Sequence, residues 1–171
     1  MSQLRTGRLL LRPIRPDDAA FYFELVNTDA WLTYIGDKGI RSVEQARESI
    51  INGPMAMREQ HGVTFHVVSL LDDPAPLGVC GLILRDTLPG IDIGYAFLPT
   101  AWGRGYAREA AQAVAMQGRD TLGLTRLFGI VSPGHEASIR VLEHLGMRYR
   151  ETLKIRDDGQ DTLLYAVEFG A

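Results

Sequence analysis

Residues 91–107 have the sequence IDIGYAFLPTAWGRGYA, which combines a strand-like apolar segment, a short turn and a glycine loop that leads directly into a predicted helix. The first N–H groups of a helix have no carbonyl partners within it, and the peptide dipoles add partial positive charge there. Gly103 and Gly105 can adopt a positive φ, so a bulky group can approach the backbone closely. The segment therefore predicts a binding site for a phosphate or diphosphate. A tight strand-to-helix turn without a ligand would use the same glycines.

The helix predicted after this loop carries small apolar residues on one face. They recur at intervals of three and four residues, at Ala107, Ala110, Ala111, Val114 and Ala115. Such a stripe lets a helix pack closely against a sheet. Glu109 lies in the first turn, where negative charge is favoured. The pattern supports the placement of the glycine loop at a helix start.

The composition is that of an ordinary globular protein. The 171 residues are 46% hydrophobic and 23% charged, which predicts one continuous domain over residues 1–171. A net charge of -3 without a run of Lys or Arg argues against a nucleic-acid partner. The segment that begins at Met1 has no signal-peptide core, and no stretch is apolar enough to span a membrane. We therefore expect a cytoplasmic protein with no membrane partner.

The order of predicted elements indicates a mixed α/β fold with the glycine loop near the middle of the sheet. Strands are expected at residues 4–12, 63–71, 77–85, before the glycine loop, and at 127–131, 147–155 and 162–169. Helices are expected at residues 15–27, at 43–59, after the glycine loop, and before Gly146. Seven strands and four helices are thus predicted, with Trp31 and Tyr34 in a loop between the first two helices.

Three segments resemble the GNAT acetyltransferases. Residues 93–95 leading into 102–110 resemble the acetyl-CoA loop of that family, residues 136–147 resemble its following segment, and residues 8–13 fit its opening. Within the family, the chain is most similar to the branch of ribosomal-protein N-terminal acetyltransferases (RimJ/RimL-like). The resemblance implies a mostly antiparallel sheet that splays at the central cofactor strand. It also implies transfer of an acetyl group from acetyl-CoA to a primary amine by direct attack in a ternary complex.

The resemblance further implies a set of cofactor-binding residues. Backbone groups at Ala96, Phe97 and Leu98 would hold the pantetheine arm, and the amides of residues 102–107 would bind the diphosphate. His135 stands where family members commonly have Asn, and imidazole can still donate or accept one hydrogen bond. The implied contacts are Ala96, Phe97, Leu98, Trp102, Gly103, Arg104, Gly105, Tyr106, Ala107 and His135.

Two residues are candidates for the catalytic proton transfers. An amine is protonated at neutral pH and must lose a proton before it attacks a thioester. Asp92, on the strand that feeds the glycine loop, is the candidate base, although a solvated or salt-bridged strand residue is the alternative. Many family members use a tyrosine to protonate the leaving thiolate, but this chain has Leu142 there. The resemblance implies Ser138 as the substitute acid.

The acceptor amine cannot be identified from the sequence. Exposed aromatic residues at Trp31 and Tyr34 are candidate substrate contacts, although packing between helices would also explain them. Protein N-termini, polyamines, amino acids and amino-group antibiotics all remain open. The terminal hairpin offers an edge through which a homodimer could form. No His, Cys or Asp spacing predicts a metal.

Two other functions use parts of the same pattern. A dinucleotide-binding oxidoreductase would need a third glycine at position 108, which is Arg108. A non-catalytic acyl-CoA-binding or sensing module remains open, because His135 and Leu142 depart from the family pattern. Cys80 lies in an apolar strand, where a buried and unreactive thiol is expected.

Overall fold

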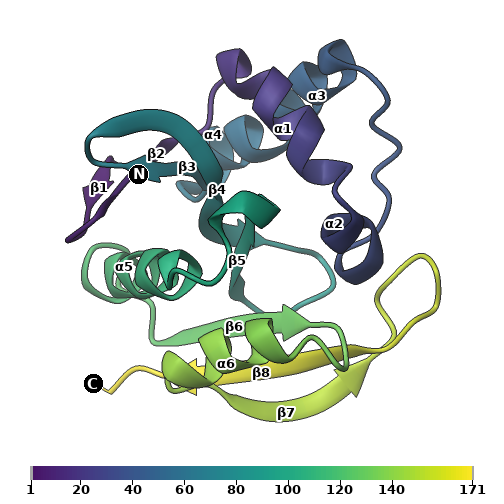
Figure 1. The fold of residues 1–171 in the computed structure, drawn as a ribbon. Helices are drawn as coiled ribbons and strands as arrows, with labels where there is room; N and C mark the ends of the chain where they lie inside the picture. Colours follow the sequence, from purple (N-terminus) through teal and green to yellow (C-terminus); the bar gives the residue numbers. More distant parts are fainter. Residues whose placement is uncertain (1, 171) are drawn as a thin grey trace.

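The computed structural model describes residues 2–170, and the end residues Met1 and Ala171 of the predicted domain lie outside that range. Within it, one eight-stranded sheet has the order β1-β2-β3-β4-β5-β6-β8-β7 (Figure 1). All neighbouring strands are antiparallel except β5 and β6, which are parallel. The strands are β1 (Leu4–Arg5), β2 (Leu9–Pro13), β3 (Phe65–Leu70), β4 (Asp73–Leu84), β5 (Ile91–Phe97), β6 (Arg126–Val131), β7 (Arg148–Leu153) and β8 (Thr162–Glu168). The predicted mixed, mostly antiparallel fold is confirmed.

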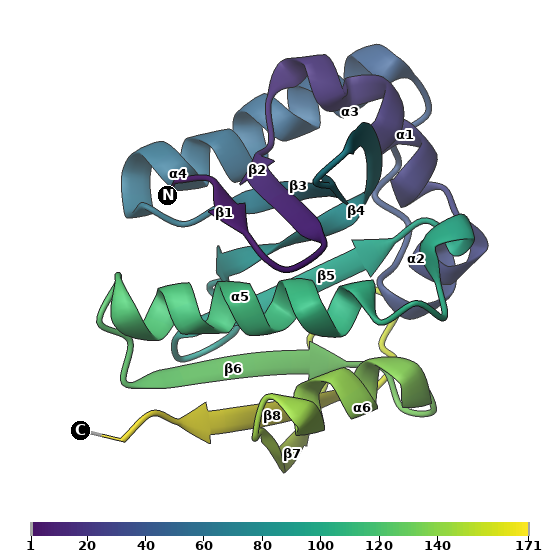
Figure 2. The same ribbon diagram turned by 60° about the vertical axis from the view of Figure 1, so that its left-hand side comes forward.

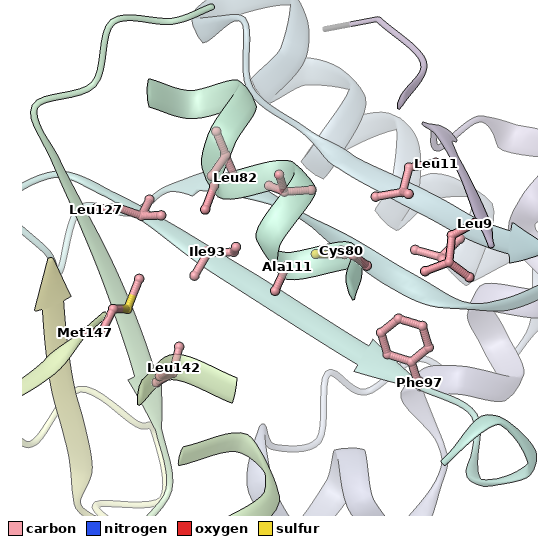
Figure 3. Packing of buried hydrophobic residues seen from close by; sticks show 14 of the residues in the cluster. Leu9, Leu11, Cys80, Leu82, Ile93, Phe97, Ala111, Leu127, Leu142 and Met147 are labelled. Carbon is pink, nitrogen blue, oxygen red and sulfur yellow. The ribbon is translucent and has the colours of Figure 1, made fainter. Parts of the chain in front are cut away.

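Helices cover both faces of this sheet (Figures 1 and 2). They are α1 (Ala19–Val26), α2 (Asp29–Tyr34), α3 (Val43–Ile50), α4 (Ala56–His61), α5 (Tyr106–Asp120) and α6 (Glu136–His144). Alternate residues of a strand point to opposite faces, and the core divides accordingly. Cys80 and Leu82 of β4 pack with α5 and α6, whereas Val79 packs with α1 and α3. Figure 3 shows Leu82, Ala111 and Leu142 among the side chains of the first of these clusters.

The two halves of the sheet separate at its centre. β5 and β6 pair only at Asp92 with Phe128 and at Ile93 with Gly129. Beyond Ile93, β5 stays paired with β4, whereas β6 continues along β8. Residues 94–97 therefore lack a strand partner on the side of β6. The expected splay at the central cofactor strand is confirmed.

The element counts predicted from the sequence are wrong in two places. The expected first strand is a short hairpin, because the chain reverses at residues 6–8 between β1 and β2, which gives eight strands instead of seven. Residues 29–34 form α2 instead of a loop, because the Thr28 hydroxyl accepts a hydrogen bond from the Trp31 amide and caps the helix. Together with the division of the expected 43–59 helix into α3 and α4, this gives six α-helices among the described residues instead of four.

The long helix expected at residues 43–59 is present in a modified form. It begins at Ser42, whose hydroxyl accepts from the Gln45 amide, and it ends at Gly62 with a φ of 74°. Between α3 and α4, residues Ile51–Met55 form a π-helical turn that contains Pro54. Proline has no N–H to donate, so the regular hydrogen-bond ladder is interrupted there.

Candidate functional site

The glycine loop presents unpaired amides at the start of α5. Gly103 and Gly105 have φ values of 77° and 79°, and Gly105 directly precedes the helix. The amide of Glu109 is the first to bond back, to the Gly105 carbonyl at 3.1 Å. Among residues 2–170, no acceptor pairs with the amides of residues 103–108. A Cβ built on Gly103 would meet nothing within 4 Å. Open space beside unpaired N–H groups fits a diphosphate.

A contact from the N-terminal hairpin braces this loop. The Glu109 carboxylate accepts hydrogen bonds from the Thr6 hydroxyl at 2.6 Å and from Arg8 Nε at 2.9 Å. Arg8 also donates to the Arg104 carbonyl at 2.8 Å and lies over the Tyr106 ring. Desolvation opposes ionisation of Glu109, but the bonds from Thr6 and Arg8 outweigh it and lower its pKa. The brace was not predicted, because its partners are far apart in the chain.

A cleft of about 1740 Å³ connects the glycine loop, the splay and the segment around α2. All the predicted site residues line it except Leu98 and Arg104. It therefore brings together the predicted cofactor, catalytic and acceptor residues. Arg108 and Arg140 also line it, and their side chains are exposed.

The free edge of β5 belongs to two residues. The Leu98 amide donates to the Leu77 carbonyl of β4 at 2.8 Å, so by alternation the backbone groups of Ala96 also face β4. Tyr95 and Phe97 then face the splay. The Phe97 carbonyl already accepts from the Trp102 indole at 2.9 Å, which ties the loop to the strand.

Asp92 lies at the base of the splay with a fully buried side chain. One oxygen, Oδ1, accepts from Arg85 Nε at 3.0 Å, whereas Oδ2 is buried without a hydrogen-bond partner in the described part of the chain. Desolvation raises the pKa of Asp92, and the opposing charge of Arg85 does not fully offset it. Asp92 is therefore a salt-bridged strand residue that also keeps one buried carboxylate oxygen without a partner in the described part of the chain.

Ser138 meets Tyr95 across the splay. The Tyr95 hydroxyl donates to the Ser138 carbonyl at 3.0 Å and lies 3.0 Å from the Ser138 Oγ. Desolvation raises the pKa of Tyr95, so the phenol stays protonated at neutral pH. Sequence reasoning missed this role of Tyr95. The available signal was its alternation with Ile93, which places both residues on the face covered by α5 and α6.

Tyr34, one of the predicted acceptor residues, is held in place by contacts from two other segments of the chain. Tyr34 stacks on His135, with ring centroids 3.8 Å apart and planes 9° apart. The Tyr34 carbonyl accepts from Ser132 Oγ at 2.7 Å and from Arg156 at 2.8 Å. Arg156 comes from the segment between β7 and β8, which lies beside α2 in Figure 1. Desolvation lowers the pKa of His135, which favours the neutral ring.

Trp31 is 4% exposed and meets Tyr22 edge-on, so its expected packing between helices is observed. Its edge also lines the cleft, and its indole N–H is buried without a partner within residues 2–170.

Two other side chains that could carry chemistry, Cys80 and His66, do not line the cleft. Cys80 is fully buried among apolar residues, which raises its thiol pKa. His66 is also buried, and desolvation lowers its pKa to about 4. In the part of the chain that the structure describes, no group of three or more His, Cys, Asp or Glu could hold a metal ion. No helix there is both long and apolar enough to cross a membrane.

Comparison with known proteins relates this site to a family. A family model described as an acetyltransferase (GNAT) domain matches residues 8–148. The uncharacterized N-acetyltransferase YoaA of Bacillus subtilis (strain 168) is 30% identical over 152 residues, which cover 88% of this chain and 85% of YoaA. An acetyltransferase from Agrobacterium tumefaciens str. C58 has a TM-score of 0.83 at 27% identity and covers 99% of this chain and 95% of its own.

RimL, a ribosomal L7/L12 alpha-N-protein acetyltransferase solved in complex with coenzyme A, has a TM-score of 0.81. The alignment covers 95% of each chain at 17% identity, so it shows a common fold. The family match spans the braced glycine loop, the splayed strand and α6, and on that basis the chain belongs to the GNAT acetyltransferase family.

Proposed function

We propose that this protein transfers the acetyl group of acetyl-CoA to a primary amine by direct attack in a ternary complex. The observation that carries the proposal is the single cleft, which joins the unpaired amides of residues 103–108 to the buried carboxylate of Asp92. One end suits an anionic cofactor, and the other offers a group that can take a proton. GNAT acetyltransferases use acetyl-CoA, which makes it the natural occupant of the cofactor end.

The cofactor would occupy the loop and the splay together. Amides at the start of α5 would hold the diphosphate, while the free edge of Tyr95 and Phe97 would accept the pantetheine arm as an added strand. Trp102 and His135 would shape the channel from its two sides. This placement brings the thioester to the point where β5 and β6 separate, close to Asp92.

Asp92 would act as the general base. Its unpaired Oδ2, which has no exposed surface, would take a proton from the acceptor's ammonium group through a water molecule, and the free amine would then attack the thioester carbonyl carbon. As the C–N bond forms and the C–S bond breaks, the nitrogen releases its second proton to solvent, and the thiolate leaves with a proton from an acid that solvent then reprotonates. Holding the amine and the thioester together lowers the activation barrier by about 7–11 kcal/mol. A positioned base accelerates the reaction by about 10²–10⁴-fold, which is the smaller contribution.

Ser138 would supply the proton to the leaving thiolate. The family tyrosine is replaced by Leu142, which is 1% exposed and packed in the core. The Tyr95 hydroxyl lies 3.0 Å from both the Ser138 carbonyl oxygen and Ser138 Oγ, so its one proton can be directed to either, and when it points at Oγ the serine proton is free to point at the sulfur. Tyr95 would thus be a positioning residue for Ser138.

The finer assignments are also proposals. We place the protein in the RimJ/RimL-like branch in the cytoplasm, as one domain that acts on a protein N-terminus or a small amine. β7 is the outer strand of the sheet, so a second copy could pair there.

A screen for acetyl transfer tests the proposed function. Purified protein is mixed with acetyl-CoA and with protein N-terminal peptides, polyamines, amino acids or amino-group antibiotics, and thiol release is measured. Mass spectrometry then locates the acetyl group on the product. We expect release with at least one group; binding of acetyl-CoA without release by any amine would favour a non-catalytic sensing module instead.

A further inference from the structure

Two cationic side chains lie at the acceptor end of the cleft with donors to spare. Arg85 uses Nε to pair with Asp92, and its two terminal nitrogens have no hydrogen-bond or ion-pair partner among the described residues. Its side chain is 38% exposed and lines the cleft, so these nitrogens are accessible from it. A guanidinium presents five donors in a fixed fork that matches a carboxylate.

Lys38 adds a second cation to the same end. It lies between α2 and α3, lines the cleft, and places its ammonium 5.9 Å from the centroid of the Trp31 ring. No carboxylate within residues 2–170 forms an ion pair with it. The residue is exposed, yet desolvation by the surrounding protein still lowers its pKa, and the positive charge of Arg85 lowers it further. Lys38 and Arg85 both line the same cleft.

The acidic side chains near this space are mostly occupied. Asp37 pairs with Arg41, and Asp158 pairs with Arg156. Asp157, from the segment between β7 and β8, is a further exposed acid that lines the cleft, as are Glu136 and Glu143 of α6. The acceptor end therefore carries two cations with free donors, Arg85 and Lys38, against two carboxylates, Asp92 and Asp157, which suits a molecule that itself carries both charges better than a polycation.

We propose that the acceptor is a small amine that carries a carboxylate next to the amino group, as a free amino acid does. This inference rests on the proposed function and narrows its substrate class. The ammonium of such a molecule would lie on the Asp92 side of the Arg85–Asp92 pair, while its carboxylate would meet the terminal nitrogens of Arg85 and the ammonium of Lys38. Because Arg85 and Asp92 are in direct contact, they match two opposite charges that are only one or two carbons apart.

The test compares each amino acid with its own carboxamide. The twenty amino acids, their carboxamides, a set of polyamines and a neutral peptide are assayed for thiol release from acetyl-CoA. Loss of the carboxylate is expected to lower kcat/KM by about 10- to 100-fold, since a hydrogen bond to a charged group is worth about 1.5–3 kcal/mol. Equal or faster turnover of the carboxamides, the polyamines or the neutral peptide overturns the inference.

Variants separate the anion contact from the proton transfer. Lys38→Met and Arg85→Gln should each shrink the preference for carboxylate over carboxamide, and this ratio cancels any general loss of activity. Arg47→Gln is the matched control, because Arg47 pairs with Glu44 on α3 and does not line the cleft. An unchanged ratio in both cleft variants contradicts the inference. If no amine in any group releases thiol, the proposed function itself fails, which is a different result.

Discussion

At the scale of single residues, Asp92 is the group on which the proposed chemistry depends most. A carboxylate with no exposed surface is costly to ionise, and Arg85 offsets only part of that cost. The pKa of Asp92 is therefore raised, so its charged form is favoured only at higher pH than for an ordinary aspartate. Between the unfolded and the folded pKa of Asp92, the folded state binds more protons than the unfolded state. The contribution of Asp92 to the free energy of unfolding therefore falls as pH rises through this range.

Replacement of this base should give a pH-dependent defect. Asp92→Asn is expected to lower kcat/KM by about 10²–10⁴-fold at neutral pH, because it removes a positioned base. The loss should shrink at high pH, where more of the acceptor amine is already free. A pH series of initial rates measures this, and equal slowing at every pH counts against Asp92 as the base.

The leaving-group proton should depend on Ser138. Ser138→Ala is expected to lower kcat on the order of 10²-fold with little change in the KM for acetyl-CoA, because the hydroxyl acts after binding. Tyr95→Phe should have a smaller effect, since the serine hydroxyl remains. Cys80→Ala is the control, as this buried thiol lies outside the cleft. Steady-state kinetics of the three variants decides the matter, and full activity of Ser138→Ala would remove Ser138 from the mechanism.

At the scale of elements, the glycine loop combines a local geometry with a distant support. Positive φ at Gly103 and Gly105 turns the chain into α5, and this could be read from the sequence. The Arg8 and Glu109 contact that fixes the loop could not, because its partners are separated by 101 positions. A loop held in this way needs less reordering when an anion binds, which lowers the entropic cost of binding.

A single methyl group in this loop should separate binding from folding. Gly103→Ala meets no atom within 4 Å but forces alanine to a φ of 77°, a strain of about 1–3 kcal/mol. Relief of that strain would turn the amides away, so the Kd for coenzyme A should rise about tenfold or more, as measured by calorimetry.

Gly81→Ala provides the contrast for that variant. Its Cβ would lie 2.1 Å from the Thr64 carbonyl oxygen of the neighbouring segment, so it should reduce the free energy of unfolding instead. Unchanged coenzyme A affinity in Gly103→Ala would argue that the loop is only a turn.

At the scale of the whole molecule, the site exists because two half-sheets diverge. β4 and β5 stay paired to Phe97, and β6 and β8 stay paired to Val131, so the gap between β5 and β6 opens without breaking other ladders. A ligand strand in that gap would join the halves.

Acetyl-CoA should therefore stabilise the folded protein. At about 100 times its Kd, a ligand adds about 2.7 kcal/mol, which for a chain of this size raises Tm by about 5–10 °C. NAD is the control and should leave Tm unchanged, because the loop lacks the dinucleotide fingerprint at Arg108. A thermal-shift titration measures both, and a matching rise with NAD contradicts the assignment of the loop.

The sequence by itself determined the elements whose signals are local: the strand, glycine loop and helix of residues 91–120, the capped start at Ser42 and the glycine end at Gly62. Capping groups, side-chain periodicity and allowed φ angles act over a few residues, so they can be read without the fold. The short helix at Trp31 was missed because six residues carry too weak a periodicity.

Only the tertiary structure decided which distant side chains meet. The strand order brings Tyr95 to Ser138 across 43 positions, Arg8 to Glu109 across 101, and Arg156 to Tyr34 across 122. Whether Asp92 is solvated or buried also depended on what packs around β5. These facts follow from the packing of the sheet and its covering helices, because burial and long-range contacts are properties of the assembled chain and not of any local segment.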